Sequence, residues 1–183
     1  MKLLSLLSIA GIACALPTPD VPSGPNIIQP SARSIYEVNT GAIYYQSQTG
    51  HIFKSSSGND LTTLLTFDLP SSLQGKTCSF HFYLDSTARA EGTKAFDLYS
   101  SLKPATANSP GGSGPGNQRN QFMGRMKAVL GGEATWVPDV FPKTGESFPC
   151  PYGDAFGYEV VGSGDYVDIA WNPPASGSYI SWS

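Results

Sequence analysis

Two carboxylates near the C-terminal end have a spacing that could support catalysis. Glu159 lies in residues 156–160 and Asp168 in residues 165–171, and both segments alternate apolar and polar side chains with the period of a β-strand. The glycine-rich residues 161–164 lie between them, so we expect the two strands to form a hairpin.

The hydrophobic pattern also predicts how this hairpin pairs. Val167, Ile169 and Trp171 should point toward the core. The register that keeps apolar residues together pairs Val160 with Asp165, Tyr158 with Val167, and Phe156 with Ile169. Glu159 and Asp168 then share the outer face. Because glycoside hydrolases use two carboxylates about 5–10 Å apart, a carbohydrate-active hydrolase or lyase is one interpretation. A solvated acidic surface without catalysis is the interpretation we favour.

Aromatic and amide-rich positions are candidates for binding rather than catalysis. Tyr83 and Tyr166 fall opposite the expected core, and Trp136 lies near the end of a segment. Exposed rings of this kind can stack on sugars, or they can cover a second buried face or a sheet edge. Asn117 and Arg119 belong to a cluster of polar donors that could bind a ligand or hold their own loop in place.

Other catalytic and metal-binding patterns are missing from the sequence. His51 and His81 are far apart, no zinc-ligand spacing occurs, and no Gly-x-Ser-x-Gly motif is present. We therefore expect no cofactor, no metal and no catalytic residue.

Composition limits the class of protein and its partners. The 183 residues include 20 Gly and 15 Pro, which suits one domain with many turns, and the formal net charge is −3. A mildly acidic chain without a basic run is not expected to bind nucleic acid or an anionic membrane.

The N-terminal end has the pattern of a secretory signal peptide. Lys2 precedes the apolar run 3–13, and Ala13-Cys14-Ala15 forms a small-residue cleavage pattern. The proline-rich residues 16–34 read as a leader or linker, so we expect the domain to comprise residues 35–183. The apolar run is too short to span a bilayer. These features predict a secreted, extracellular protein.

Removal of residues 1–15 would leave two cysteines, Cys78 and Cys150. In an oxidising compartment an even pair is expected to form a disulfide, and two free thiols are the alternative. The bridge would close a loop of about 70 residues and stabilise the fold by roughly 4 kcal/mol.

The rest of the chain reads as short strands separated by turns. We expect strands at residues 35–38, 42–46, 52–54, 64–69, 77–85, 95–100, 122–129, 133–137 and 178–182, besides the two described above. Residues 103–121 read as one long loop. No helix of useful length is expected. The predicted fold is all-β, a single antiparallel β-sandwich that is jelly-roll-like in one of its forms.

Seven short motifs follow one another in a recognisable order. They are Cys78-Ser79-Phe80-His81-Phe82, Gly116-Asn117-Gln118, Gly132-Glu133-Ala134, Cys150-Pro151, Tyr158-Glu159-Val160, Asp165-Tyr166-Val167-Asp168-Ile169 and Gly177-Ser178-Tyr179-Ile180. Together they resemble the fungal But-two C-terminal domain family, from about Ser34 to Ser183. The resemblance implies a fungal origin and a β-rich domain common in secreted or cell-surface proteins. It transfers no catalytic residue.

Three functions fit these observations. The first is a non-enzymatic, secreted binding or effector-like module that contacts cell-wall polysaccharide or an extracellular protein. The second is the hydrolase or lyase using Glu159 and Asp168. The third is implied by the family name alone: a protein-binding module for a ubiquitin-like modifier pathway.

Overall fold

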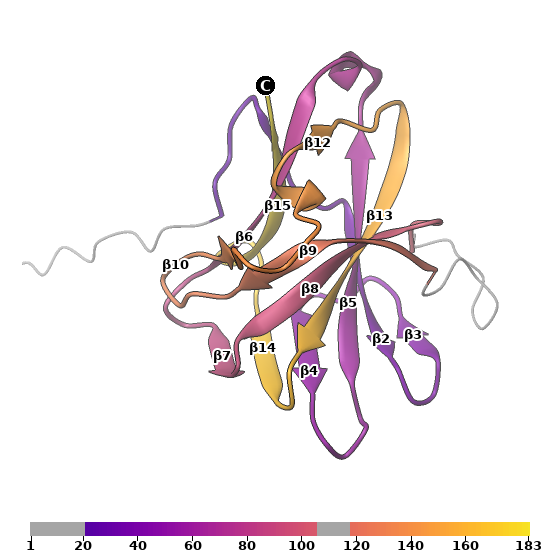
Figure 1. Cartoon of the computed structure of the whole chain (residues 1–183). Helices are drawn as coiled ribbons and strands as arrows, with labels where there is room; N and C mark the ends of the chain where they lie inside the picture. The colour runs from indigo at the N-terminus through magenta and orange to yellow at the C-terminus, as the bar shows by residue number, and fades with distance from the viewer. Residues whose placement is uncertain (1–20, 106–117) are drawn as a thin grey trace, which may run out of the picture.

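The computed structural model describes residues 21–105 and 118–183, and this part of the chain is built from β-strands (Figure 1). The strands are β1 (Ile27–Ile28), β2 (Ala32–Glu37), β3 (Ala42–Tyr44), β4 (Gly50–Lys54), β5 (Leu61–Leu69), β6 (Thr77–Leu84), β7 (Arg89–Gly92), β8 (Ala95–Ser101), β9 (Arg119–Lys127), β10 (Gly132–Glu133), β11 (Thr135–Trp136), β12 (Phe148–Pro149), β13 (Asp154–Ser163), β14 (Val167–Trp171) and β15 (Gly177–Trp182). Two single-turn 3-10 helices, Ser71–Leu73 and Thr144–Glu146, connect them.

The strands form two antiparallel sheets, so the predicted all-β fold is confirmed. The smaller sheet has the order β1-β15-β6-β10, and β12 also pairs with β6. The larger sheet has the order β11-β9-β8-β13-β5-β4-β14-β7, with β2 paired to β5 and β3 paired to β2. Among the described residues, no helix is long and apolar enough to cross a bilayer.

The larger sheet curls around the core. Strand β4 joins β5 through one pair, Phe53 and Leu61, and then pairs along its whole length with β14. Ile52 and Ile169 on this curled part are fully buried in the same cluster as Phe80 and Phe96. The curl therefore brings β4, β14 and β7 over the core that β6 and β8 also line.

The predicted disulfide is present between Cys78 and Cys150. Cys78 lies on β6, whose inward face also carries Phe80, Phe82 and Leu84, all without exposed surface. The sequence separation of 72 residues means that the bridge connects the early part of the chain to the segment before β13.

The expected hairpin between residues 156–160 and 165–171 does not form. Strand β13 pairs with β5 and β8, whereas β14 pairs with β4 and β7, so the predicted register is wrong. The face assignment of β14 is nevertheless confirmed, because Val167, Ile169 and Trp171 are all buried. Alternation determines which side of a strand is apolar, and it says nothing about which strand lies beside it.

The sheets also begin earlier than expected. Strand β1 and the first residues of β2 lie within residues 16–34, the segment predicted to be a leader. Strand β9 begins at Arg119, inside the predicted loop 103–121. The predicted strand 133–137 is divided between β10, in the smaller sheet, and β11, in the larger one.

Candidate functional site

A strip of polar and aromatic side chains lies on the outer face of β4, β14 and β7. We call it the β14 strip, and it consists of His51, Phe53, Arg89, Glu91, Tyr166 and Asp168. Ile52, Ile169 and Ala90 on the same strands point into the core. Because side chains alternate along a strand, the residues of the strip lie on the opposite face.

Asp168 is the centre of the strip. Its Oδ1 atom lies 2.9 Å from His51 Nε2 on one neighbouring strand and 2.8 Å from Arg89 Nη2 on the other. The Asp168 side chain is 12% exposed, whereas the Arg89 side chain is 48% exposed. A largely buried carboxylate therefore holds a half-exposed guanidinium and an imidazole at fixed positions on the surface.

The contacts determine the tautomer of His51. A carboxylate can only accept a hydrogen bond, so His51 Nε2 must carry a proton and donate it to Asp168. Arg89 Nη2 lies 3.4 Å from the same nitrogen, and both atoms donate to Oδ1 rather than to each other. In the neutral ring, His51 Nδ1 is then an acceptor, assigned here from the hydrogen-bond network.

Aromatic rings lie at the other end of the strip. Tyr166 is 40% exposed, and its ring meets that of Phe53 edge to face, with 6.3 Å between centroids. The Tyr166 hydroxyl donates to Glu91 Oε2 at 3.2 Å. Partial desolvation, together with this hydrogen bond, raises the pKa of Tyr166, so it remains a neutral phenol in the physiological range.

A surface pocket opens beside Arg89. Its volume is about 270 Å³, and its polar lining comes from His51, Arg89, Thr49, Thr87 and Asn172. The strip therefore combines flat rings at one end with a pocket of hydrogen-bonding groups at the other.

Glu159 does not lie on an exposed surface, contrary to the prediction. It has no exposed surface, and it accepts hydrogen bonds from Arg119 Nε at 2.9 Å, Arg119 Nη2 at 2.8 Å and Thr62 Oγ1 at 2.7 Å. Arg119 also lies over the Tyr99 ring, 4.8 Å from its centroid. The hydrogen bonds to Glu159 raise the pKa of Arg119. On the outer side of the larger sheet, a fully buried carboxylate therefore forms an ion pair with an arginine whose side chain is 35% exposed.

Consequently, Glu159 and Asp168 do not form a carboxylate pair. Glu159 lies opposite Leu64 and Tyr99, whereas Asp168 lies opposite Phe53 and Glu91. Each acid is neutralised by its own arginine on its own group of strands. The arrangement of two carboxylates flanking one glycosidic bond is therefore not assembled here.

The remaining predicted residues occupy different places. Tyr83 was expected on an exposed face, but it is 7% exposed and lies under the N-terminal segment. Trp136 is half-buried against Gly124 and Gly145. Asn117 lies outside the described residues. Of the predicted binding residues, the structure brings together Tyr166 with Asp168, and Arg119 with Glu159.

Sequence reasoning missed His51, Phe53, Arg89 and Glu91 in the strip. Each alternates with a buried neighbour, which is the available signal, but nothing in the sequence indicates that β4 and β7 flank β14. The described residues contain no group of three or more His, Cys, Asp or Glu side chains that could hold a metal ion.

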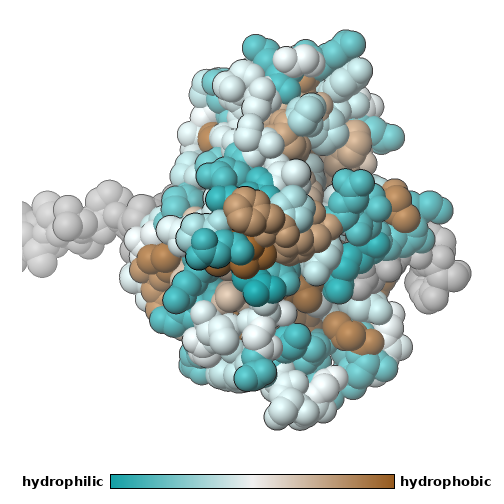
Figure 2. Space-filling view, viewed as in Figure 1, coloured by the Kyte–Doolittle hydropathy of each residue, from teal (hydrophilic) through white to brown (hydrophobic). Residues whose placement is uncertain are grey.

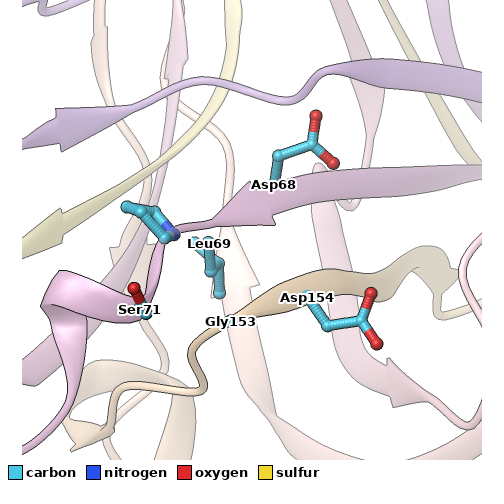
Figure 3. Close-up of a pocket in the computed structure, with 6 residues that line it drawn as sticks. Asp68, Leu69, Ser71, Gly153 and Asp154 are labelled. Carbon is cyan, nitrogen blue, oxygen red and sulfur yellow. The ribbon is translucent and has the colours of Figure 1, made fainter.

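Two other surface features, a second hollow and the apolar patches, do not combine aromatic rings with paired charged groups as the β14 strip does. Figure 3 shows a hollow where β5 ends and β13 begins, lined by Asp68, Leu69, Ser71, Gly153 and Asp154. Its two acids belong to exposed residues and have no basic neighbour in its lining. Figure 2 shows the hydrophobic residues of the viewed face as small separate patches among hydrophilic ones, with no continuous apolar surface there.

Comparison with known protein families identifies a family whose model covers most of the chain. The family model described as the ubiquitin 3 binding protein But2 C-terminal domain matches residues 25–172, from just before β1 to just after β14. The match includes every residue of the β14 strip. A comparison with curated proteins finds no match.

Proposed function

We propose, from the premise that this chain belongs to the But2 C-terminal domain family, that it is a secreted, non-catalytic binding domain for a neutral cell-wall carbohydrate. The β14 strip is its binding site. The observation that carries this proposal is the immobilised arrangement of Arg89 and His51 around Asp168, next to the rings of Tyr166 and Phe53.

The chemistry of the strip favours a sugar over other ligands. Flat rings stack on the apolar faces of sugar rings, while guanidinium, imidazole and carboxylate groups bind the hydroxyls. The positive charge of Arg89 is offset by the negative charge of Asp168, and Glu91 adds a further negative charge. The strip therefore does not attract anions strongly. A neutral polysaccharide fits this balance better than an acidic one.

Preorganisation supports binding at this strip. The side chains of His51 and Arg89 are held by the same carboxylate oxygen, so little conformational entropy is lost when a ligand contacts them. The Cys78–Cys150 disulfide and the signal-like residues 1–15 support an extracellular location.

The family description supports a second candidate, a protein-binding module. The printed family description refers to binding of a protein, and Arg89, Glu91 and Tyr166 of the β14 strip are exposed on a sheet face that a protein could contact. A secreted protein-binding module would bind an extracellular partner protein through the same residues. The experiment below distinguishes a polysaccharide ligand from a protein ligand.

The test is binding of the oxidised, mature protein to insoluble β-glucan, chitin and mannan, followed by titration with the matching oligosaccharide. Tyr166→Ala should weaken binding about tenfold, the equivalent of one ring contact of about 1.4 kcal/mol. Tyr44→Ala is the matched control, because Tyr44 is also exposed and also donates to a glutamate, Glu37, but lies on β3. Equal affinities of the two variants would contradict the site, and no binding to any of the polysaccharides would favour a protein ligand.

A further inference from the structure

The N-terminal residues 21–28, which we call the N-terminal strap, lie along the edge and the outer face of the smaller sheet. Within the strap, β1 pairs with β15, with Ile27 opposite Ser181 and Ile28 opposite Ile180. Asn26 accepts a hydrogen bond from the backbone N–H of Trp182 at 3.1 Å. Figure 1 shows the indigo strap running beside β15 near the C-terminus.

Two side chains of the strap pack on aromatic rings of the sheet. Val21 forms a cluster with Tyr83 and Tyr179, and Ile27 packs against it. All three members of this cluster are less than a tenth exposed, and the cluster is separate from the main core. The strap therefore occupies a surface site through two aliphatic side chains that lie six positions apart.

The strap fills this site incompletely. The hydroxyl of Tyr83 is buried and has no hydrogen-bond partner among the described residues. The neighbouring Tyr179 hydroxyl, in contrast, donates to Glu133 Oε1 at 2.5 Å. A buried donor without an acceptor is unfavourable, and an acceptor placed beside Tyr83 would make a hydrogen bond that the strap does not make.

The backbone pairing of the strap is also short. Strand β1 has two residues, and Pro22 and Pro25 cannot donate to a ladder. Strand β15 has six residues. Ile180 and Ser181 are in register with β1 and Trp182 bonds to Asn26, so the pairing with the strap leaves residues 177–179 outside it. Sheet edges of this kind bind extended peptides by adding a strand, with pockets that accept alternate side chains.

We infer that the outer edge of β15, together with Tyr83 and Tyr179, is a binding site for an extended peptide, occupied in cis by the N-terminal strap. The ligand it fits is an extended segment with two aliphatic side chains, seated as Val21 and Ile27 are. Because the strap is covalently attached, its effective concentration at the site is on the order of millimolar. An external peptide therefore has to displace the strap before it can bind. This site lies on the smaller sheet and does not depend on the function proposed for the β14 strip.

The test uses a labelled peptide with the sequence of residues 21–30 and the full chain carrying Val21→Asp and Ile27→Asp. Release of the strap is checked by faster hydrogen exchange at the Trp182 N–H, which donates to Asn26. Fluorescence anisotropy should show saturable binding at least tenfold tighter than to the wild-type chain. Ser23→Asp is the control, because it adds a charge to the same strap at an exposed position and should leave the site closed.

A second version keeps the test decisive if the double variant does not fold. A protease site is inserted between Gln29 and Pro30, next to an exposed residue, and the protein is cleaved after folding. We expect the cleaved strap to stay bound and to exchange with the labelled peptide. A peptide that carries both aspartates should not exchange. Release of the strap without uptake of the labelled peptide, in either version, would overturn the inference, as would equal binding to wild-type and variant chains.

Discussion

The indole of Trp171 lies directly against the backbone of Gly50. The two residues are paired across β14 and β4, and a Cβ atom built on Gly50 would come within 2.0 Å of the ring. Glycine is required here for close approach. Its side-chain hydrogen leaves room for a buried tryptophan on the face opposite the His51–Asp168 contact.

Gly50→Ala should therefore destabilise the protein strongly. We expect the free energy of unfolding to fall by about 3 kcal/mol or more, because neither the buried ring nor the strand backbone can move easily. Denaturant unfolding of the oxidised protein measures this change. Gly132→Ala is the control, since its Cβ would meet no atom closer than 3.5 Å and should change stability by less than about 1 kcal/mol. Similar losses in the two variants would contradict the packing described for Trp171.

Tyr83→Phe should not destabilise the protein, unlike most changes to a buried residue. The variant removes a buried hydroxyl that has no partner, and we expect the free energy of unfolding to stay unchanged or to rise by about 1 kcal/mol. Tyr179→Phe removes the hydrogen bond to Glu133 and should lower the free energy of unfolding by about 1–2 kcal/mol. The two variants are compared by thermal and denaturant unfolding. A larger loss for Tyr83→Phe than for Tyr179→Phe would show that the Tyr83 hydroxyl has an acceptor.

The Glu159–Arg119 ion pair should show strong coupling. Arg119→Met leaves a fully buried carboxylate without its main cation, so we expect a loss of about 3–5 kcal/mol in the free energy of unfolding. Adding Glu159→Gln removes the buried charge and should recover part of this loss. A double-mutant cycle measured by denaturant unfolding tests the coupling. Losses that simply add would mean that the two side chains do not stabilise each other.

His81 should make the protein less stable as the pH falls. Burial is the larger influence and lowers the pKa of His81, although the charge of Glu133 opposes this shift. Because the pKa is lower in the folded state, the unfolded chain binds the proton first, and stability falls as the pH drops through about 6.5 toward the folded pKa. Unfolding free energies between pH 8 and pH 5 should decline less steeply in His81→Gln than in the wild type. Parallel curves would contradict the prediction.

Several features of the fold follow from local sequence. The inward faces of β6 and β14 were predicted from alternation alone, because a strand places every second side chain on the same side. Residues 77–84 and 167–171 have one apolar face each, so their orientation required no knowledge of their neighbours. The pairing of Cys78 with Cys150 followed from there being two cysteines outside the signal-like segment.

The candidate site was less predictable. Asp168 and Tyr166 were identified from the sequence, but His51 and Arg89 were not, although both lie within 2.9 Å of Asp168. Glu159 was expected beside Asp168 because the glycine-rich residues 161–164 suggested a hairpin. The chain instead continues β13 through these residues to Ser163, paired with β8, and β14 pairs with β4 and β7.

The sequence by itself determined the all-β class and the core-facing side of the strongest strands, because both depend on residue types with a period of two. It also indicated the disulfide, because two cysteines lie outside the signal-like segment. Only the tertiary structure decided which strands lie side by side. That choice depends on the total apolar surface that a complete arrangement of two curled sheets buries, and no single segment contains this information. It buried Glu159 beneath its ion pair with Arg119, assembled His51, Asp168 and Arg89 on one sheet face, and covered Tyr83 with the N-terminal strap.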